Sequence, residues 1–379
     1  MAQLSRGAAR AGTRRGPGLK HPLMGARLSV LINVFTRNGL IEPRHLPLAL
    51  LMILSALGRL PVQPIERLKL ARLARAASPM EAPVFVIGHW RSGTTHLHNL
   101  LARSAAFGHI SPLASGLPDE ILTLGTWFRP LLERALPEDR HVDRVAVTPD
   151  SPQEDEIPLA NLQPLSVFHA VYSPKHFQRL FDRAVFFEGC SAEEIERWTG
   201  AVKSFAEKIS LHQGGRRLLI KNPVYTARLT RLLEIWPEAR FIHVRRNPYE
   251  VFVSTRHYYR TLLADLAMQP FDHIDLDAFV LATFKRLMDA YDQQCRALPP
   301  GTLTEVSYER LRREPLLVLT DIHEIMGLPG WADTEQRVRA YLETVADYRA
   351  NSYRITDTDR SAVDRAWKPY IKAWEAMAR

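Results

Sequence analysis

A short strand, a turn and the start of a helix are encoded by one stretch, Val84-Phe85-Val86-Ile87-Gly88-His89-Trp90-Arg91-Ser92-Gly93-Thr94-Thr95. Its β-branched and aromatic start is typical of a short buried strand, and the residues from Thr94 to about Arg103 favour a helix. Between them, Gly88 and Gly93 let the backbone curl close to an anion. The free N–H groups of such a turn, and of the helix that follows, point at that anion. The sequence therefore predicts a phosphate- or sulfate-binding loop between a strand and a helix.

The side chains of this loop favour anion binding without metal-assisted phosphoryl transfer. Arg91 supplies a fixed positive charge, and the hydroxyls of Thr94 and Thr95 can donate hydrogen bonds. The spacing is similar to that of a Walker A loop, but residue 94 is Thr where a nucleotidase needs Lys. No acidic residue at the end of a strand is placed to hold Mg²⁺. The alternative is a glycine turn without a ligand.

The rest of the chain alternates strands with helices. We expect strands at 218–220, 241–244 and 303–306, and helices opened by Pro223, Pro248 and Pro315. This order predicts an α/β fold in which helices cover both faces of a central parallel sheet. Ligands of such sheets bind at the carboxyl ends of the strands, where the loop at 88–95 lies.

A second candidate anion site follows the strand at 241–244. Arg246 precedes Asn247-Pro248, and Ser254 lies eight residues after Arg246. Arginine makes bidentate contacts with phosphate, and a proline at a helix start leaves the first N–H groups facing the same anion. Alone, this turn is weak evidence. Together with the first loop it favours a ligand with two separated phosphates over ATP.

These motifs resemble those of the sulfotransferases that use the donor PAPS (3′-phosphoadenosine 5′-phosphosulfate). GHWRSGTTHLHNLLA is similar to the family's 5′-phosphosulfate loop, and RRNPYEVFVSTRHYY is similar to its 3′-phosphate motif. The resemblance covers roughly residues 84–105 and 215–330 and implies a P-loop-like three-layer sandwich. It also implies a set of residues that hold PAPS: Arg91, Ser92, Gly93, Thr94 and Thr95 at its 5′ end, Arg246 and Ser254 at the 3′-phosphate, and Tyr308 near the adenine. Arg91 would also take the place of the family's catalytic basic residue.

The acidic segment at 154–156 is the candidate general base. Sulfuryl transfer to a hydroxyl or amine needs a group that takes the acceptor proton. Related bacterial enzymes carry a similar Glu-Asp-Glu segment, and we expect Glu154 to be the base, followed by Glu156 and then Asp155. The three carboxylates precede an apolar stretch, so some must be paired or have raised pKa values. The alternative is an acidic helix cap. Rival bases are His98 and His169, and Lys221 could approach either substrate or lie on the surface.

Composition limits the ligands and the compartment. The 379-residue chain has a net charge of +9 and a pI near 9.7, which suits a polyanionic ligand: a nucleotide, an anionic membrane or a nucleic acid. Its two cysteines, Cys190 and Cys295, are far apart and suit a reducing compartment, so we expect a cytoplasmic protein. We expect no metal site and no nucleic-acid partner.

The N-terminal region precedes the predicted catalytic domain. We expect a disordered basic tail at 1–22, a helical extension at 23–82, the sulfotransferase domain at 83–345 and a C-terminal tail or helix at 346–379. The apolar run at 46–57 is shorter than the roughly 20 residues of a spanning helix. Residues 46–77 therefore either form a peripheral membrane contact or pack on the domain.

These observations together predict a metal-independent sulfotransferase that moves a sulfuryl group from PAPS to a hydroxyl or amine. The acceptor, a small molecule, lipid or glycan, is left open, as is the oligomeric state. A P-loop kinase or NTPase-like protein is the first alternative. A non-catalytic binder of membranes or nucleic acid is the second.

Overall fold

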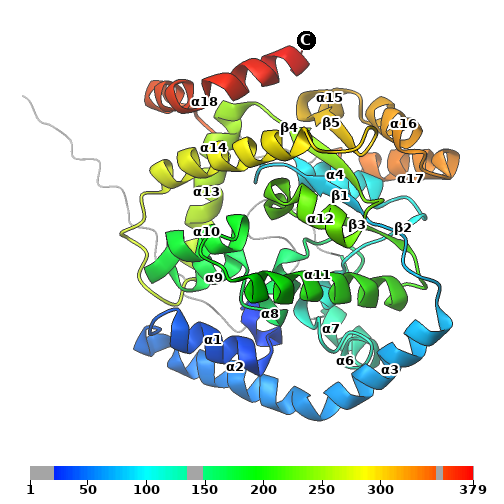
Figure 1. Cartoon of the computed structure of the whole chain (residues 1–379), viewed down its shortest axis with the longest axis vertical. Coiled ribbons are helices and arrows are strands. Elements are labelled where there is room, and N and C mark those ends of the chain that lie inside the picture. Colours follow the sequence, from blue (N-terminus) through cyan, green and yellow to red (C-terminus); the bar gives the residue numbers. More distant parts are fainter. Residues whose placement is uncertain (1–20, 135–147, 347–352, 379) are drawn as a thin grey trace, which may run out of the picture.

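The computed structural model describes residues 21–134, 148–346 and 353–378 and contains a five-stranded parallel sheet (Figure 1). The strand order is β2-β3-β1-β4-β5, so the strand before the phosphate loop lies at the centre. The strands are β1 (Val84–Ile87), β2 (Phe107–Gly108), β3 (Arg217–Lys221), β4 (Arg240–Arg245) and β5 (Leu303–Ser307). Four of them confirm the predicted strands within one or two residues. The two-residue β2 was not predicted, because it is too short to produce a periodic pattern.

Successive strand residues point into two separate apolar cores, which makes the fold a three-layer sandwich. One core contains Phe85 and Ile87 with residues of the helices α11 (Ala192–His212), α13 (Pro248–Leu266), α14 (Leu276–Cys295) and α18 (Asp357–Ala378). The other contains Val84 and Val86 with residues of α4 (Thr94–Leu101), α16 (Pro315–Met326) and α17 (Trp331–Thr344). Both cores are dominated by side chains with at most 9% exposure. The predicted α/β class with helices on both faces is confirmed.

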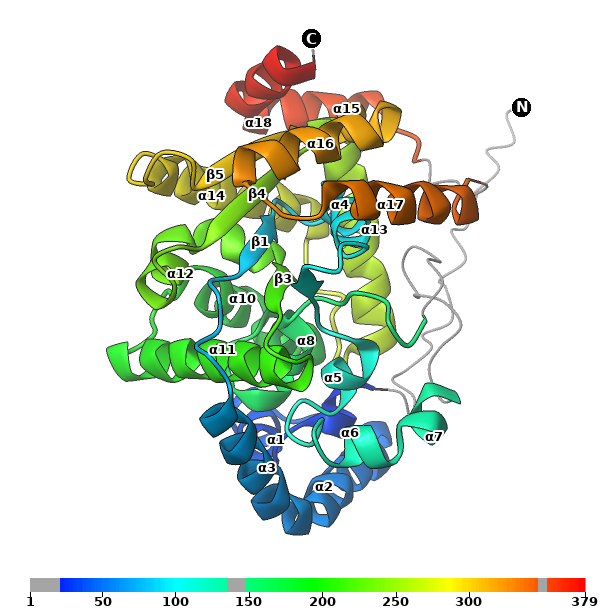
Figure 2. The ribbon, with the colours of Figure 1, turned by 90° about the vertical axis from the view of Figure 1, so that its right-hand side faces the viewer.

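The residues before the sheet form a helical extension along one end of the molecule (Figures 1 and 2). Its helices are η1 (Pro22–Gly25), α1 (Leu28–Arg37), η2 (Pro43–His45), α2 (Leu46–Arg59), η3 (Leu60–Val62) and α3 (Gln63–Ala76). In Figure 2, α2 and α3 form a V at the end of the molecule opposite α16 and α18. The predicted tail falls, for residues 1–20, outside the described residues.

Between β1 and β3 the chain is mainly helical. The helices are α4 (Thr94–Leu101), α5 (Pro112–Gly116), α6 (Leu124–Trp127), α7 (Arg129–Arg134), α8 (Glu156–Leu162), α9 (Val167–Tyr172), η4 (Pro174–His176), α10 (Phe177–Phe186) and α11 (Ala192–His212). Aromatic residues of this region, among them Tyr172, Phe177 and Phe181, are at most 4% exposed and belong to the core.

The second half of the chain completes both helical layers. Its helices are η5 (Pro223–Ala227), α12 (Leu229–Ile235), α13 (Pro248–Leu266), α14 (Leu276–Cys295), α15 (Tyr308–Arg313), α16 (Pro315–Met326), α17 (Trp331–Thr344) and α18 (Asp357–Ala378). The helix expected from Pro223 is interrupted, because Arg228 leaves the helical conformation (φ −137°, ψ 25°). The C-terminal α18 packs back on the domain, with Trp367 stacked on Phe284 at 3.9 Å between ring centroids.

Candidate active site

The loop after β1 has the backbone conformation of an anion cradle. Gly88 and Gly93 have positive φ angles of 144° and 98°, and so has Arg91 at 68°. A positive φ is uncommon for a residue with a side chain and is concentrated at functional sites. The hydroxyl of Ser92 is buried and has no hydrogen-bond partner among the residues that the structure describes. Burying a hydroxyl without a hydrogen-bond partner costs free energy, and an anion bound in the loop would accept its hydrogen bond.

Neighbouring elements fix both ends of this loop. The Gly88 N–H donates to Thr226 Oγ1 at 2.8 Å, and Thr226 returns a hydrogen bond to the Gly88 carbonyl at 3.1 Å. Thr255 of α13 donates to the Trp90 carbonyl at 3.2 Å, while the Trp90 ring is buried. The cradle is thus pre-organised before any ligand binds.

The structure brings the two predicted anion sites into direct contact. Arg91 Nε donates to Ser254 Oγ at 3.0 Å, and Arg246 Nη1 donates to the Arg91 carbonyl at 3.0 Å. Glu250, one turn into α13, accepts from Arg246 Nε at 3.0 Å. Two guanidinium groups and a buried hydroxyl therefore meet at the carboxyl ends of β1 and β4, where a doubly anionic ligand would find partners.

Tyr308, at the start of α15, closes the other side of the loop. The Arg246 guanidinium lies 4.6 Å from the centroid of its ring, a cation–π distance. A Cβ atom built on Gly93 would lie 2.1 Å from Tyr308 Cδ2, so the ring occupies the space that a side chain at 93 would need. This close approach explains why glycine is required at 93.

The acidic segment at 154–156 divides into one carboxylate that faces the loop and two that are buried. Glu154, whose side chain is 23% exposed, pairs with Lys221 at the end of β3. Lys221 Nζ also lies 3.4 Å from Thr95 Oγ1, so this ion pair connects Glu154 to the phosphate loop. Lys221 is 1% exposed, so the interpretation as a surface lysine is wrong.

Asp155 and Glu156 are buried and share a hydrogen-bond donor, Asn222. Asn222 Nδ2 donates to Asp155 Oδ1 at 2.7 Å and to Glu156 Oε2 at 2.8 Å, and the Tyr225 hydroxyl donates to Asp155. Glu156 Oε1 also accepts from Ser166 Oγ at 2.8 Å and from the backbone N–H of residue 167 at 3.0 Å. Burial raises the pKa of Asp155 to about 7 and also raises that of Glu156. The expectation of paired carboxylates with raised pKa values is confirmed.

The two rival histidines are both structural. His169 is buried, with one ring nitrogen 2.8 Å from the Pro164 carbonyl and the other 2.8 Å from the Ala160 carbonyl. His98 is fully buried, and its Nε2 lies 3.3 Å from the Leu219 carbonyl. Within the described ranges 21–134, 148–346 and 353–378, no three His, Cys, Asp or Glu side chains come together in a group that could hold a metal ion.

Comparison with known proteins identifies the family. A model of the sulfotransferase family matches residues 83–333, most of the chain. The chain belongs to the sulfotransferase family. The match decides against the kinase or NTPase interpretation and against a purely non-catalytic binder.

The relatives of this sulfotransferase are bacterial. It is 30% identical over 292 residues to the omega-hydroxy-beta-dihydromenaquinone-9 sulfotransferase Stf3 of Mycobacterium tuberculosis, covering 77% of this chain and 74% of that protein. Its fold is similar to the crystal structure of sulfotransferase STF9 from Mycobacterium avium (TM-score 0.63, 19% identity, 92% and 96% of the two chains). It is also similar to that of STF1 from M. tuberculosis (TM-score 0.60, 17% identity, 90% and 91%). The P-loop-like fold is thereby confirmed.

Sequence reasoning missed several residues that organise the sulfotransferase site. Asn222 and Tyr225 hold the buried carboxylates, and Glu250 orients Arg246. Sequence analysis considers a role for Lys221 but none for its neighbour Asn222. The partners of Asn222 lie 66 and 67 residues upstream, so a single sequence offered no signal for the pairing.

The raised pKa of Asp155 predicts a pH-dependent stability of the sulfotransferase. The folded state keeps its proton up to about pH 7, whereas the unfolded chain releases it near the ordinary value of 3.8. Between these values the folded state binds more protons, so the free energy of unfolding should fall as the pH rises, by about 1.4 kcal/mol per pH unit at most. Asp155→Asn should remove this contribution. The measurement is urea unfolding of both proteins at several pH values; a wild-type-minus-variant difference that does not decrease from pH 5 to pH 7 would contradict the assignment.

Proposed function

We propose that this sulfotransferase transfers a sulfuryl group from PAPS to a hydroxyl group of an apolar small molecule or lipid in the cytoplasm. The observation that carries the donor is the direct contact between the loop at 88–95 and the pair Arg246 and Ser254. A 3′,5′-bisphosphorylated nucleotide places two anionic groups within one molecule, and these residues supply cations and donors for both.

In this proposal each predicted residue has a role in holding the donor. The 5′-phosphosulfate is held by the loop amides and by Ser92, Thr94 and Thr95. Gly93 has no side chain, so the loop backbone can come close to this anion. Arg246 and Ser254 hold the 3′-phosphate, and Tyr308, already stacked by Arg246, lies beside the adenine. The unpartnered Ser92 hydroxyl and the positive φ of Arg91 support this assignment, because both are costs that a bound anion would offset.

The transfer itself needs a base and a stabilised leaving group. Glu154 takes the proton from the acceptor hydroxyl, the hydroxyl oxygen forms a bond to sulfur, and the bond from sulfur to the bridging phosphate oxygen breaks. The products are the sulfated acceptor and PAP, adenosine 3′,5′-bisphosphate. Arg91, Lys221 and the loop amides stabilise the charge that develops on the bridging oxygen. Glu154 is favoured over Asp155 and Glu156 because it alone of the three pairs with a residue that contacts the phosphate loop.

The relative Stf3 supports an apolar acceptor. Its name specifies a hydroxylated dihydromenaquinone, a long isoprenoid molecule, as its substrate. At 30% identity over most of both chains the same chemistry, a hydroxyl on an apolar molecule, is a reasonable inference for this protein. A hydroxyl acceptor also suits a carboxylate base.

Calorimetric titration with PAP, and separately with ATP plus Mg²⁺, tests the donor. We expect micromolar or tighter binding of PAP and binding of MgATP weaker by about 100-fold, because ATP lacks the 3′-phosphate and each lost charged contact costs about 2–3 kcal/mol. Adenosine 5′-monophosphate is the matched control, since it differs from PAP only in lacking the 3′-phosphate. Equal affinity for PAP and MgATP would refute the proposal.

A further inference from the structure

The outward face of α2 is apolar along its whole length. Every exposed residue of this helix is apolar: Leu46, Pro47, Leu50, Leu51, Leu54, Leu57 and Gly58. Leu46, Leu50 and Leu54 are 56%, 57% and 54% exposed. Their spacing of four residues places them on one stripe of the helix. Surface helices of globular proteins ordinarily present charged residues on this side, so the stripe is unusual.

The same surface continues beyond α2. In α3, Ile65, Leu68 and Leu73 are 43%, 52% and 40% exposed. Lys69 of α3 lies 5.0 Å from the ring centroid of Trp127, which joins α6 to this surface. Trp127 and Phe128 are each 50% exposed. We call the exposed apolar residues of α2, α3 and the end of α6 the apolar face.

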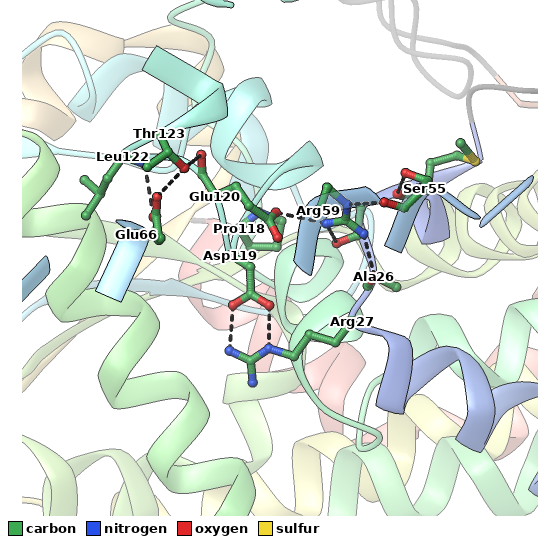
Figure 3. A network of polar contacts seen from close by, with 12 residues as sticks. Ala26, Arg27, Ser55, Arg59, Glu66, Pro118, Asp119, Glu120, Leu122 and Thr123 are labelled. Atoms are coloured by element: carbon green, nitrogen blue, oxygen red, sulfur yellow. Dashed lines mark hydrogen bonds and ion pairs between the residues drawn. The ribbon is translucent and has the colours of Figure 1, made fainter. Parts of the chain in front are cut away.

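The opposite side of α2 and α3 is fastened to the domain by buried polar contacts (Figure 3). Arg59 donates to Glu120 Oε2 at 2.9 Å, to the Gly25 carbonyl at 3.0 Å and to the Ala26 carbonyl at 2.6 Å. Glu66 accepts from Thr123 Oγ1 at 2.7 Å and pairs with Lys208 at 3.2 Å.

These contacts bear on how the extension meets a bilayer. The segment Pro43–Ala76 is long and apolar enough by composition to cross a membrane. Here it is divided by η3 into two helices. The inner side of α2 buries Ala49, Met52, Ala56 and Arg59, and that of α3 buries Glu66, which pairs with Lys208 of α11. This arrangement lays the helices along the protein and directs their apolar residues outward.

Positive charge surrounds the apolar face. From residue 28 to residue 77 every exposed charged side chain is an arginine: Arg37, Arg44, Arg67, Arg72 and Arg75. The two acidic residues of this range, Glu42 and Glu66, are both at least half-buried and engaged in ion pairs. An apolar stripe bordered by cations is the pattern of helices that lie in the interface of anionic membranes.

We propose that the apolar face of α2 and α3 docks this protein on the surface of an anionic lipid bilayer, with the helices parallel to the membrane plane. The leucines enter the boundary between headgroups and acyl chains, and the surrounding arginines contact lipid phosphates. This inference goes beyond the proposed function, and its test does not require turnover.

The proposed base lies close to the helical extension. Glu154 is two residues before α8, whose far end contacts the extension: the Asn161 carbonyl accepts from the Arg27 N–H at 2.9 Å, and the Leu162 carbonyl from Arg27 Nη1 at 3.2 Å. One seven-residue helix, about 10 Å long, therefore separates the base from the extension. Docking would place the site near the bilayer without inserting it.

Flotation of the full-length chain with phospholipid vesicles tests the proposal. We expect it to bind vesicles that contain phosphatidylglycerol and to bind pure phosphatidylcholine vesicles more weakly. The double variant Leu50→Gln/Leu54→Gln should lose affinity for both by about 100-fold, because two apolar side chains no longer leave water. The triple variant Arg67→Gln/Arg72→Gln/Arg75→Gln should lose only the preference for phosphatidylglycerol.

Leu317→Gln/Ile325→Gln is the matched control. These residues of α16 are 50% and 57% exposed, as exposed as the leucines, but lie at the opposite end of the molecule (Figure 2). This control should float as the wild type does, and circular dichroism melting checks that every variant is folded. The proposal would be overturned if Leu50→Gln/Leu54→Gln floated as well as the wild type, or if neither protein floated. It would also be overturned if the wild type bound no vesicles and formed a dimer while this variant was a monomer, because the apolar face would then be an interface between copies.

Discussion

Glu154→Gln is expected to lower the turnover number by about 100- to 10,000-fold, the usual contribution of a positioned general base. Glutamine has nearly the shape of glutamate but cannot accept the acceptor proton. The glutamine oxygen can still accept a hydrogen bond from Lys221, but this 1% exposed lysine loses its counter-charge, so the variant should stay folded and bind PAP while losing about 3 kcal/mol of stability. Single-turnover sulfation with saturating PAPS measures the chemical step directly.

Glu156→Gln is the matched control for this prediction. Its carboxylate accepts hydrogen bonds from Ser166, from the backbone N–H of residue 167 and from Asn222. The amide of glutamine would place a donor against one of these donors, so this variant should lose stability by about 1–3 kcal/mol. A fully folded Glu156→Gln protein with lost turnover, beside an active Glu154→Gln protein, would assign the base to Glu156 instead.

Arg246→Ala is expected to weaken PAP binding by about 100-fold or more, because a charge-assisted, bidentate contact with a phosphate is lost. The substitution also removes the hydrogen bond to the Arg91 carbonyl and the guanidinium that stacks on Tyr308. Both losses loosen the loop, so the turnover number should fall as well. Calorimetric titration with PAP at two salt concentrations measures the loss and should show a weaker salt dependence in the variant.

The neighbouring Arg245 provides the control. Arg245 Nε donates to Glu305 Oε1 of β5 at 2.8 Å, so its guanidinium is engaged away from the Arg246–Arg91 contact. Arg245→Ala should therefore change PAP affinity by less than about threefold, the effect of one distant charge in a screened solvent. If both variants bound PAP as tightly as the wild type, Arg246 would not contact the 3′-phosphate, and the donor assignment would lose its main support.

The sequence predicted the sheet and the two anion motifs because local patterns encode them. VFVI, FIHV and the glycines of the loop are short-range signals, and the parallel sheet then brings strand ends together by topology. The same argument places residues 88–95 beside Arg246 from the sequence alone. It did not predict that Arg246 would bond to the Arg91 carbonyl, because that contact depends on the φ of 68° at Arg91.

The organisation of the acidic cluster could not be predicted, because it depends on long-range pairing. Three adjacent carboxylates look alike in sequence, yet Glu154 turns to Lys221 whereas Asp155 turns to Asn222 and Tyr225. Likewise, residues 46–77 offered two interpretations. The structure shows that their inner side packs on the domain, through contacts such as that of Arg59 with Glu120, which is 61 residues away in the sequence.

The fastening of the helical extension has a consequence for the folding of the whole chain. Glu120 is 1% exposed and meets Arg59, and Lys208 of α11 meets Glu66. A chain shortened to begin at β1 would leave these buried ionic groups without their counter-ions, and an unpaired buried charge is far more costly than a paired one. The extension is therefore an integral part of the fold. It and the catalytic domain should unfold together as one cooperative unit.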